Sequence, residues 1–530
     1  MKKLLALLCS LTVMLSACAS FRYKETGTYV SSDGNLKRQT TTVTQVTSDG
    51  TEDITKTQEL DPTVSEVLTT KNVPTGGLSA GGGNNLSFGE MTLADGGENF
   101  TVVSWNNTDM PALLNAWIGN DDGVSLDYMY NVERLDGART PNGVPINFVN
   151  LECGSFDAKQ AYDNMLAGGE DIDIYCVEPD YLREYADYDT KSAPMSSLGF
   201  SDDMWSDSFE YVQNIGRNGN GELRAISWQA CPGGYAYRTD MAESYLGVTS
   251  PEEMQTLVCD WGTMEQTAAK VYEASSGQTA MAATVAGMGL AAGSYNGSFT
   301  ENGWIFEGTL NAYDNKALSF LEMAKHWTDS GYVTSAYQWG DEWYRLGVEN
   351  KTMGYFVATW GFDIILGGDY YTDPTGASTA IPPTQQWAVV QGPSLFYWGG
   401  TWMLVNSRTD NGTDCRDFIA ATTLDTETMT LIAESRGDFV NNKTIVQTTY
   451  NQPKSLGGQD YFPVLADVAS KIDIDYTKVS PYDSTISSEF MVAVSDYAYG
   501  LIETSDKTVE SFMDRVAERV PQVTIESNYD

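Results

Sequence analysis

Short apolar runs alternate with stretches of helical periodicity from residue 98 onward. The first five predicted elements are a strand at 100–105, a helix at 109–118, a strand at 144–152, a helix at 158–168 and a strand at 171–179. Asp109 is a candidate helix cap, and Pro111 would occupy the first helical turn. This order predicts an α/β fold with a mostly parallel sheet flanked by helices.

The same alternation continues to the end of the chain, which is long enough for two domains. Two long helices are predicted at 260–275 and 315–331, and an amphipathic helix at 510–520. Further strands are predicted at 352–362, 385–393 and 400–407. In a parallel sheet, ligands bind beyond the carboxyl ends of the strands, so the residues at the strand exits are candidates for a site.

Residues 19–97 differ from the remainder, because they are rich in Thr, Ser, Gly and Asp and contain no Trp. Asp49-Gly50 between two alternating runs is a hairpin signal. The apolar face of that hairpin would be thin, and a lone hairpin is marginal in water. Residues 74–85 have the composition of a flexible linker. We therefore predict that 18–97 is a flexible tether.

The first seventeen residues have the pattern of an export signal, with Lys2 and Lys3 before an uncharged run from 4 to 17. That run of 14 residues is shorter than the ~20 that a spanning helix needs. The ending Leu-Ser-Ala-Cys resembles the lipobox of bacterial lipoproteins. The resemblance implies cleavage after residue 17 and a lipid on the sulfur of Cys18. The alternative is an ordinary secretory signal in which this cysteine is incidental.

The formal net charge of −41 argues against nucleic acid and anionic membrane surfaces as partners. Candidates for metal and triad chemistry are also scarce. His326, in a helix-like stretch, is the only histidine, which argues against His-rich zinc sites and a Ser-His-Asp triad. Five cysteines follow Cys18, without a CxxC motif, and we expect most of them to be small buried residues. We predict no cofactor and no metal.

The order of several segments along the chain resembles that in the extracellular solute-binding proteins of carbohydrate ABC transporters, the relatives of maltose-binding protein. Seven segments within a loose but ordered pattern carry the resemblance. They are the lipobox, MLAGGEDIDIYCVEPDYLREYA, CPGGYAYRTDMAESYLGV, DWGTMEQTAAKV, GYFVATWGF, WGGTWMLVNSRTDN and RDFIAATTLDTETMTLIAESRGDFVNN. The chain departs from the family pattern in its long tether and in an insertion at 119–143.

The resemblance implies two α/β lobes of the type II periplasmic-binding-protein fold, joined by a hinge around a central cleft. Lobe 1 would comprise 98–230 and 396–460, and lobe 2 would comprise 235–395 and 461–530. The first crossing between them falls at 230–234, where Pro-Gly-Gly suits a hinge. The family also implies a receptor on the outer face of the cell membrane that passes its solute to a permease. We predict that this receptor is a monomer.

Sugars bind by stacking their C–H faces on aromatic rings and by bonding their hydroxyls to planar polar groups. The strand exits and crossings of this chain offer both. Trp360 resembles a family tryptophan that stacks on sugar, Asp180 resembles a ligand-binding aspartate, and Phe490 resembles an aromatic residue of the cleft. The full set of candidate ligand-binding residues is Trp360, Trp228, Trp105, Asn107, Asp109, Glu178, Asp180, Trp398, Trp402 and Phe490. Each aromatic could instead be a core residue, and Asp109 and Asp180 could be helix caps.

We therefore predict a binding protein for a sugar, in particular an oligosaccharide, and not an enzyme. The alternatives are a receptor for a peptide or polyamine, a surface glycosidase with Asp109 and Glu178 as its carboxylates, and an adhesive lipoprotein.

Overall fold

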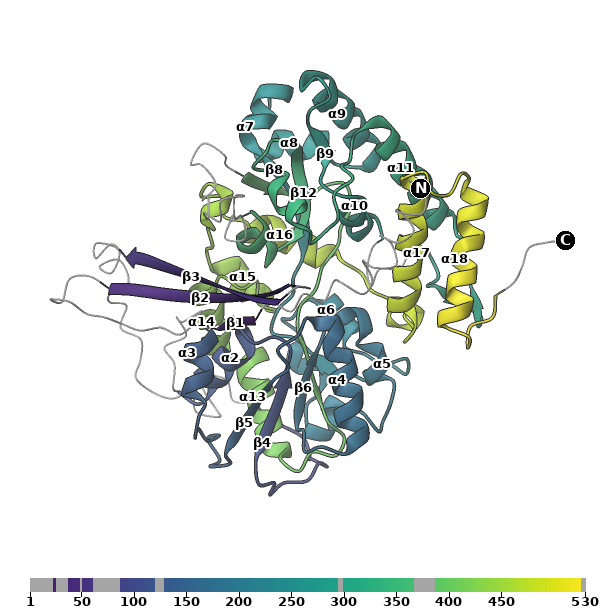
Figure 1. Ribbon diagram of the computed structural model, residues 1–530. Helices are drawn as coiled ribbons and strands as arrows, with labels where there is room; N and C mark the ends of the chain where they lie inside the picture. Colours follow the sequence, from purple (N-terminus) through teal and green to yellow (C-terminus); the bar gives the residue numbers. More distant parts are fainter. Residues whose placement is uncertain are drawn as a thin grey trace. The chain divides into compact units, whose positions relative to one another are not determined.

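The computed structural model describes residues 22–24, 37–47, 50–60, 86–119, 128–293, 299–366 and 387–525 (Figure 1). The chain divides into two compact units, residues 1–75 and 76–530. The predicted export signal, Cys18 and the glycine-rich linker at 74–85 lie outside the described residues.

The first unit contains an antiparallel sheet of three strands in the order β1-β2-β3. The strands are β1 (Arg22–Lys24), β2 (Lys37–Thr47) and β3 (Gly50–Leu60). Thr47 pairs with Gly50, so the alternation on either side of Asp49-Gly50 does form a pair of strands. That 18–97 acts as a tether stays a prediction.

The second unit begins with a five-stranded sheet in the order β5-β4-β6-β14-β7, which we call the first sheet. Its strands are β4 (Phe100–Ser104), β5 (Ile146–Asn150), β6 (Ile174–Val177), β7 (Ala225–Ile226) and β14 (Trp402–Val405). β4 is parallel to β5 and β6, whereas β14 is antiparallel to β6 and β7.

A four-stranded second sheet has the order β13-β8-β12-β9. Its strands are β8 (Gly233–Arg238), β9 (Ala280–Ala282), β12 (Thr352–Ala358) and β13 (Trp387–Val390). β12 is parallel to β9, and β8 is antiparallel to β12 and β13. The prediction of mostly parallel sheets is therefore wrong, since both sheets are mixed. β8 and β14 each enter their sheet directly from a crossing, without the helical crossover that parallel neighbours require.

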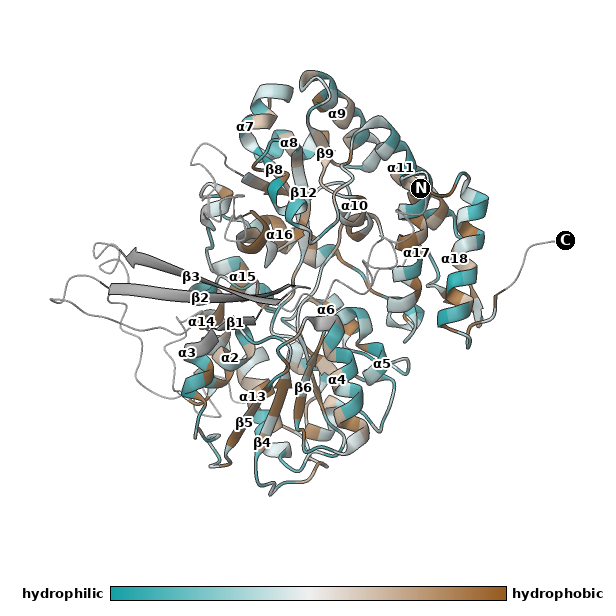
Figure 2. Ribbon diagram, viewed as in Figure 1, coloured by the Kyte–Doolittle hydropathy of each residue, from teal (hydrophilic) through white to brown (hydrophobic). Residues whose placement is uncertain are grey.

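Helices flank both sheets, and Figure 2 shows brown, apolar strands in the first sheet beside helices of mixed hydropathy. The two-lobe α/β architecture that the sequence predicts is thus observed. The α-helices are α2 (Asp109–Trp117), α3 (Tyr128–Arg134), α4 (Ser155–Gly168), α5 (Arg183–Ala186), α6 (Glu210–Ile215), α7 (Thr239–Met241), α8 (Pro251–Leu257), α9 (Trp261–Ala274), α10 (Val285–Ala292), α11 (Asn315–Ser330), α12 (Asp341–Arg345), α13 (Gly412–Thr423), α14 (Thr426–Arg436), α15 (Lys443–Thr448), α16 (Phe462–Lys471), α17 (Asp483–Ala498) and α18 (Ser505–Arg519).

Short helical turns and a small hairpin complete the described elements. They are η2 (Pro179–Tyr181), η3 (Met195–Leu198), η4 (Asp202–Trp205), η5 (Ala242–Leu246), η6 (Phe362–Leu366), η7 (Lys454–Leu456), η8 (Tyr476–Lys478), β10 (Ile305–Phe306) and β11 (Thr309–Leu310). α3 lies within the predicted insertion at 119–143. None of the helices in the described part of the chain is long and apolar enough to span a membrane.

Two crossing segments run side by side where the chain passes between the sheets. The backbone N–H of Gly233 donates to the carbonyl of Phe396 (2.8 Å), and that of Trp398 donates to the carbonyl of Cys231 (3.1 Å). A side chain on Gly233 would place its Cβ 2.1 Å from the ring of Phe396. Glycine is therefore needed here for close packing of the two crossings, in addition to any freedom that it gives the backbone.

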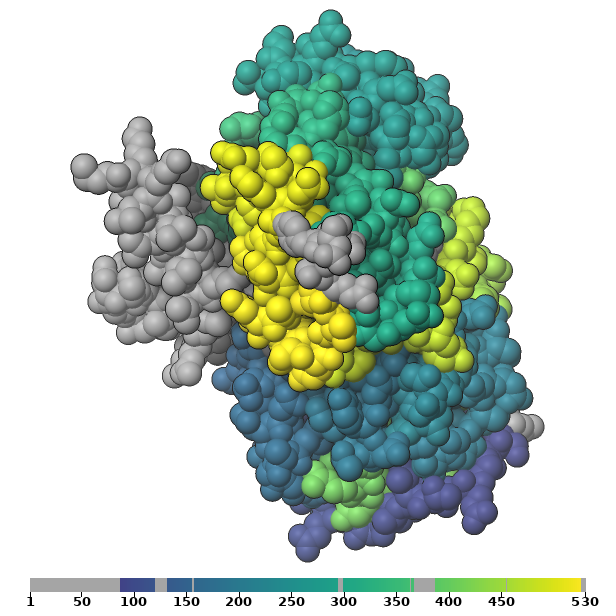
Figure 3. Space-filling view, turned by 90° about the vertical axis from the view of Figure 1, so that its right-hand side faces the viewer, coloured from purple at the N-terminus to yellow at the C-terminus, as the bar shows by residue number. Residues whose placement is uncertain are grey.

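Other segments also connect the regions around the two sheets. α16 contacts both α15 and β8. α17 contacts η2, next to the first sheet, as well as α11, next to the second. Figure 3 shows the two C-terminal helices in yellow, covering part of the teal and green segment and reaching the blue one.

Candidate functional site

Two half-buried tryptophans mark the place where β12 ends and the second crossing begins. Trp360 follows β12, and its indole N–H donates to the carbonyl of Trp398 (2.8 Å). The two ring centroids are 4.6 Å apart, at an interplanar angle of 64°. Gly399 has a left-handed backbone (φ 68°), and a Cβ there would lie 3.3 Å from the Trp360 nitrogen. The crossing thus approaches Trp360 closely and fixes its ring.

Two further tryptophans extend this pair into a contiguous cluster, which we call the tryptophan cluster (Trp339, Trp343, Trp360 and Trp398). The Trp339 ring lies nearly parallel to that of Trp360, at 11° with centroids 5.9 Å apart. It also contacts Trp398 at 5.3 Å and Trp343 at 5.1 Å. Trp343 is buried, whereas the Trp339 side chain is 48% exposed. The cluster therefore runs from the core to the solvent.

A polar network begins at the end of β4. Asn106 donates to Asp109 (3.0 Å) and to the hydroxyl of Thr401 (3.0 Å), and its own side-chain oxygen accepts from the Asp109 N–H (2.9 Å). Asp109 is itself the first residue of α2 and Thr108 is the N-cap residue, so the expectation that Asp109 caps the helix is wrong. Asp109 instead accepts a hydrogen bond from Arg436 at the end of α14.

Asp438 follows Arg436 closely in the chain and is held beside the first crossing. Its carboxylate accepts from the Trp228 indole N–H (3.3 Å) and from the Gln229 amide (3.1 Å). Burial, together with the negative charge of Asp109, raises the pKa of Asp438 to about 6. The positive charge of Arg436 opposes this rise.

Cys231 connects the acidic network to the tryptophan cluster. Burial raises the pKa of its thiol well above the usual value, and the nearby charges of Asp438, Asp109 and Glu178 add to the rise. The same thiol interacts with the side chain of Thr359, the residue immediately before Trp360. The acidic groups and the aromatic rings therefore converge on the crossing, a combination of apolar surface and a few polar groups that is typical of small-molecule sites.

Glu178 and Asp180 follow β6, as the sequence predicts. Glu178 is half-buried and precedes η2, and Asp180 lies in the first turn of η2. Asp180 is exposed to solvent. The negative charge of Glu178 contributes to the raised pKa of the Cys231 thiol, which indicates that Glu178 lies near the first crossing.

Three of the predicted ligand-binding residues lie in the core instead. Trp228 and Trp402 are fully buried, and Phe490 packs between the rings of Phe299 and Trp304. Trp402 donates its indole N–H to the carbonyl of Val212 (3.2 Å). A buried ring has no free face for a sugar, so we exclude ring stacking by these three residues in this conformation.

Trp105 and Asn107 are half-buried at the end of β4. The Trp105 indole nitrogen is buried and has no hydrogen-bond partner within the described part of the chain. Asn107 accepts from the Thr108 hydroxyl (3.3 Å). Both residues lie next to the network of Asn106 and Asp109, and their part in ligand binding stays a prediction.

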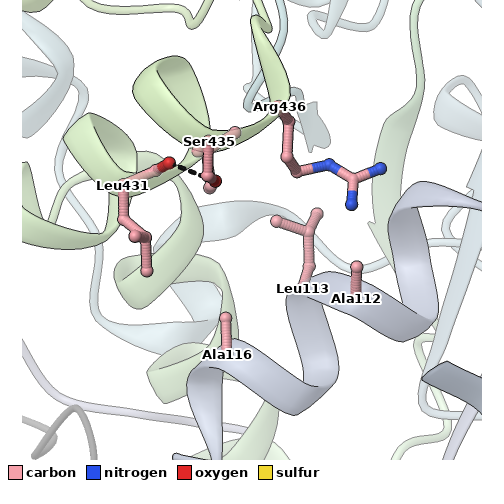
Figure 4. Close-up of a pocket in the computed structure, with 7 residues that line it drawn as sticks. Ala112, Leu113, Ala116, Leu431, Ser435 and Arg436 are labelled. Carbon is pink, nitrogen blue, oxygen red and sulfur yellow. Dashed lines mark hydrogen bonds between the residues drawn. The ribbon is translucent and has the colours of Figure 1, made fainter. Parts of the chain in front are cut away.

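A small hollow next to the network is lined mainly by apolar groups of α2 and α14 (Figure 4). Its lining includes Ala112, Ala116 and Leu431, with Arg436 at one side. The cavity holds about 10 Å³, close to the minimum for a single water molecule. It is too small for a sugar, and we assign it to imperfect packing between the two helices.

The sequence analysis missed five residues of this region: Asn106, Trp339, Trp343, Arg436 and Asp438. A local signal existed for Trp339, because Tyr337, Trp339 and Trp343 form a dense aromatic run. No local pattern indicated the ion pair of Arg436 with Asp109, whose partners are 327 positions apart.

In the described part of the chain, the cysteines and the possible metal ligands form no second cluster. All five cysteines of the described region are free, and three of them are buried, as expected. Cys259 is exposed and Cys153 is half-buried. Within the described ranges, no cluster of His, Cys, Asp and Glu side chains could hold a metal ion.

Comparison with known proteins gives a family match and several similar structures. A search of curated protein sequences finds no match. Among solved structures, an extracellular solute-binding protein of family 1 has a TM-score of 0.64 at 14% identity, covering 80% of this chain and 99% of the other. The sugar-binding protein MalE from Xanthomonas citri has a TM-score of 0.58 at 13% identity, covering 79% and 96%.

A third structure is the galacto-N-biose/lacto-N-biose I-binding protein of the ABC transporter from Bifidobacterium longum. It has a TM-score of 0.55 at 15% identity, covering 82% of this chain and 100% of the other. At such identities these likenesses establish the fold. The family model described as bacterial extracellular solute-binding protein matches residues 138–455, more than half of the sequence. The chain therefore belongs to the family of bacterial extracellular solute-binding proteins.

Proposed function

We propose that this protein is a lipid-anchored receptor that captures a saccharide, in particular an oligosaccharide, and delivers it to the permease of an ABC transporter. The observation that carries the proposal is the tryptophan cluster beside the polar network of Asn106 and Asp109. Exposed indole faces suit the C–H faces of a sugar, and carboxylates and amides suit its hydroxyls. The sugar ligands named for the structures from Xanthomonas citri and Bifidobacterium longum support the same ligand class.

The anchoring part of the proposal rests on the sequence. The export signal at 1–17 and the lipobox ending at Cys18 support a lipid-anchored protein on the outer face of the membrane, with 18–97 as its tether. We propose a monomer, in which the predicted lobes 98–230 with 396–460 and 235–395 with 461–530 close on the solute. The family assignment supports the extracytoplasmic location.

A polyamine is the second candidate ligand, because carboxylates outnumber cations at the crossing. Asp109, Glu178 and Asp438 all raise the pKa of the Cys231 thiol, and Arg436 is paired with Asp109. A glycosidase is less compatible with this geometry. Both oxygens of Asp109 accept hydrogen bonds, from Arg436 and Asn106, which leaves this carboxylate poorly placed as a general acid.

Calorimetric titration with a panel of mono- and oligosaccharides and polyamines tests the proposal. We expect one saccharide class to bind, and Trp360→Ala to weaken it at least about tenfold, since roughly 60 Å² of lost apolar contact corresponds to ~1.5 kcal/mol. Trp261→Ala is the matched control. Trp261 is also half-buried, but it packs on Trp327 and donates to Ser394, away from the cluster. Binding of polyamines without any saccharide would replace the proposal by its second candidate.

A further inference from the structure

Trp339 occupies a backbone conformation that tryptophan rarely adopts. It is the third residue of a tight turn in which the N–H of Gly340 donates to the carbonyl of Tyr337 (2.9 Å). Its φ of 73° lies in the left-handed region. This region is unfavourable for a residue with a Cβ, and glycine or asparagine is the ordinary choice at such a position. Backbone strain of this kind is concentrated at functional sites.

Hydrogen bonds from neighbouring segments hold the backbone of this turn in place. The oxygen of the Gln338 side chain accepts from the hydroxyl of Thr284 (3.0 Å), which also caps α10. The N–H of Ala336 donates to the Thr334 hydroxyl (3.2 Å). Contacts that do not involve the indole of Trp339 therefore help to hold the strained turn, in addition to the ring contacts of the cluster.

The aromatic rings around this turn become steadily more exposed toward the solvent. Trp343 is 2% exposed, Trp360 is half-buried, Trp339 is 48% exposed and Tyr337 is 65% exposed. Trp339 lies nearly parallel to Trp360 and is its outer neighbour. A ligand held at Trp360 that extends outward therefore meets Trp339 next, whereas a single small ring at Trp360 is too short to use that surface fully.

We propose that Trp339 is a specificity-determining residue that selects saccharides of several sugar units over monosaccharides, by offering its exposed ring as an outer stacking surface. This inference rests on the proposed saccharide function. It states that the protein distinguishes its ligands by the number of their sugar units. The strained backbone of the turn is then explained by the position that it gives the indole ring.

The test uses the full-length protein and homologous series of one to four sugar units, namely α-1,4-glucans, β-1,4-glucans, β-1,4-mannans and β-1,4-xylans. Binding of each is measured by calorimetry for the wild type, Trp339→Gly, Trp339→Ala and Trp339→Tyr. In Trp339→Gly we expect the affinity for the longer members of the binding series to fall about tenfold or more, with little change for the monosaccharide. Trp339→Tyr keeps a ring and should retain most of the length preference.

Glu307→Gly is the matched control, since Glu307 is exposed, has a φ of 51° and lies in the β10–β11 hairpin. It should relieve a similar backbone strain without any change in affinity. Trp339→Gly should also unfold at a higher temperature than Trp339→Ala, because glycine removes the strain that alanine keeps. Equal affinity of the wild type and Trp339→Gly for every chain length would overturn this inference alone. If no saccharide binds the wild type, the proposed function and this inference are both overturned.

Discussion

Replacing Phe490 by alanine separates a structural role for this ring from a role in the cleft. Its side chain is 1% exposed, and its ring centroid lies 4.8 Å from Phe299, 5.1 Å from Trp304 and 5.3 Å from Phe512. Truncation of a buried phenylalanine costs about 3–5 kcal/mol, from lost apolar burial and from the cavity that remains. We take about 4 kcal/mol, a large part of the 5–15 kcal/mol that stabilises a typical protein.

The assay is thermal unfolding followed by circular dichroism, with saccharide affinity measured on the same preparations. In a domain of about 150–250 residues, the size range of the predicted second lobe, 1 kcal/mol shifts the melting temperature by about 2–4 °C. Phe490→Ala should therefore melt roughly 8–16 °C lower. Its affinity for saccharide should be unchanged at temperatures where it is folded. Phe306→Ala is the control, because Phe306 is 49% exposed and should shift the melting temperature little. An unchanged melting temperature with weakened binding would refute the core assignment of Phe490.

Two further predictions concern acidity and anchoring. Burial raises the pKa of Asp483 to about 6, despite hydrogen bonds from Ser480 and the charge of Arg183. The folded state thus holds this proton more tightly than the unfolded state, and the penalty for losing it appears as the pH rises through about 4 to 6. The stability of the wild type relative to Asp483→Asn should therefore fall by up to about 3 kcal/mol between pH 4 and pH 7, as measured by urea unfolding; a difference that does not vary with pH would contradict this reasoning. Cys18→Ser should move the protein from the membrane fraction to the soluble fraction while Cys9→Ser does not, because only the first removes the proposed lipid attachment; retention of Cys18→Ser in the membrane fraction would argue against the anchor.

Local periodicity predicted the elements well where packing reinforced it. The strand expected at 100–105 is β4 at Phe100–Ser104, and the helix expected at 315–331 is α11 at Asn315–Ser330. The last helix begins at Ser505, five residues before the predicted start, because Thr504 caps it by accepting from the N–H of Lys507. Its first turn is polar and lacked the apolar repeat on which the prediction rested.

The arrangement in space was harder to predict, because it depends on contacts between distant parts of the chain. β14 is antiparallel to β6 and β7 because the chain enters it from the second crossing. The residues of β14 do not by themselves indicate this direction. The contacts of Arg436 with Asp109 and of Asp438 with Trp228 join segments more than 200 positions apart. Trp402 and Trp398 both flank Gly399-Gly400, yet one is buried and the other is half-buried. Sequence alone could not choose between them.

The position of β14 in the first sheet has a consequence for the order of folding. β14 lies between β6 and β7, and its residue Trp402 pairs with Val177, 225 positions earlier in the chain. At 5–20 residues per second, synthesis of the intervening segment takes roughly 10–45 s. During that time β6 and β7 lack the strand that joins them, so the sheet cannot be completed cotranslationally until most of the protein has been made. The emerging chain therefore stays without its full native sheet for roughly 10–45 s, an interval in which the proposed export signal would be recognised before the chain has folded.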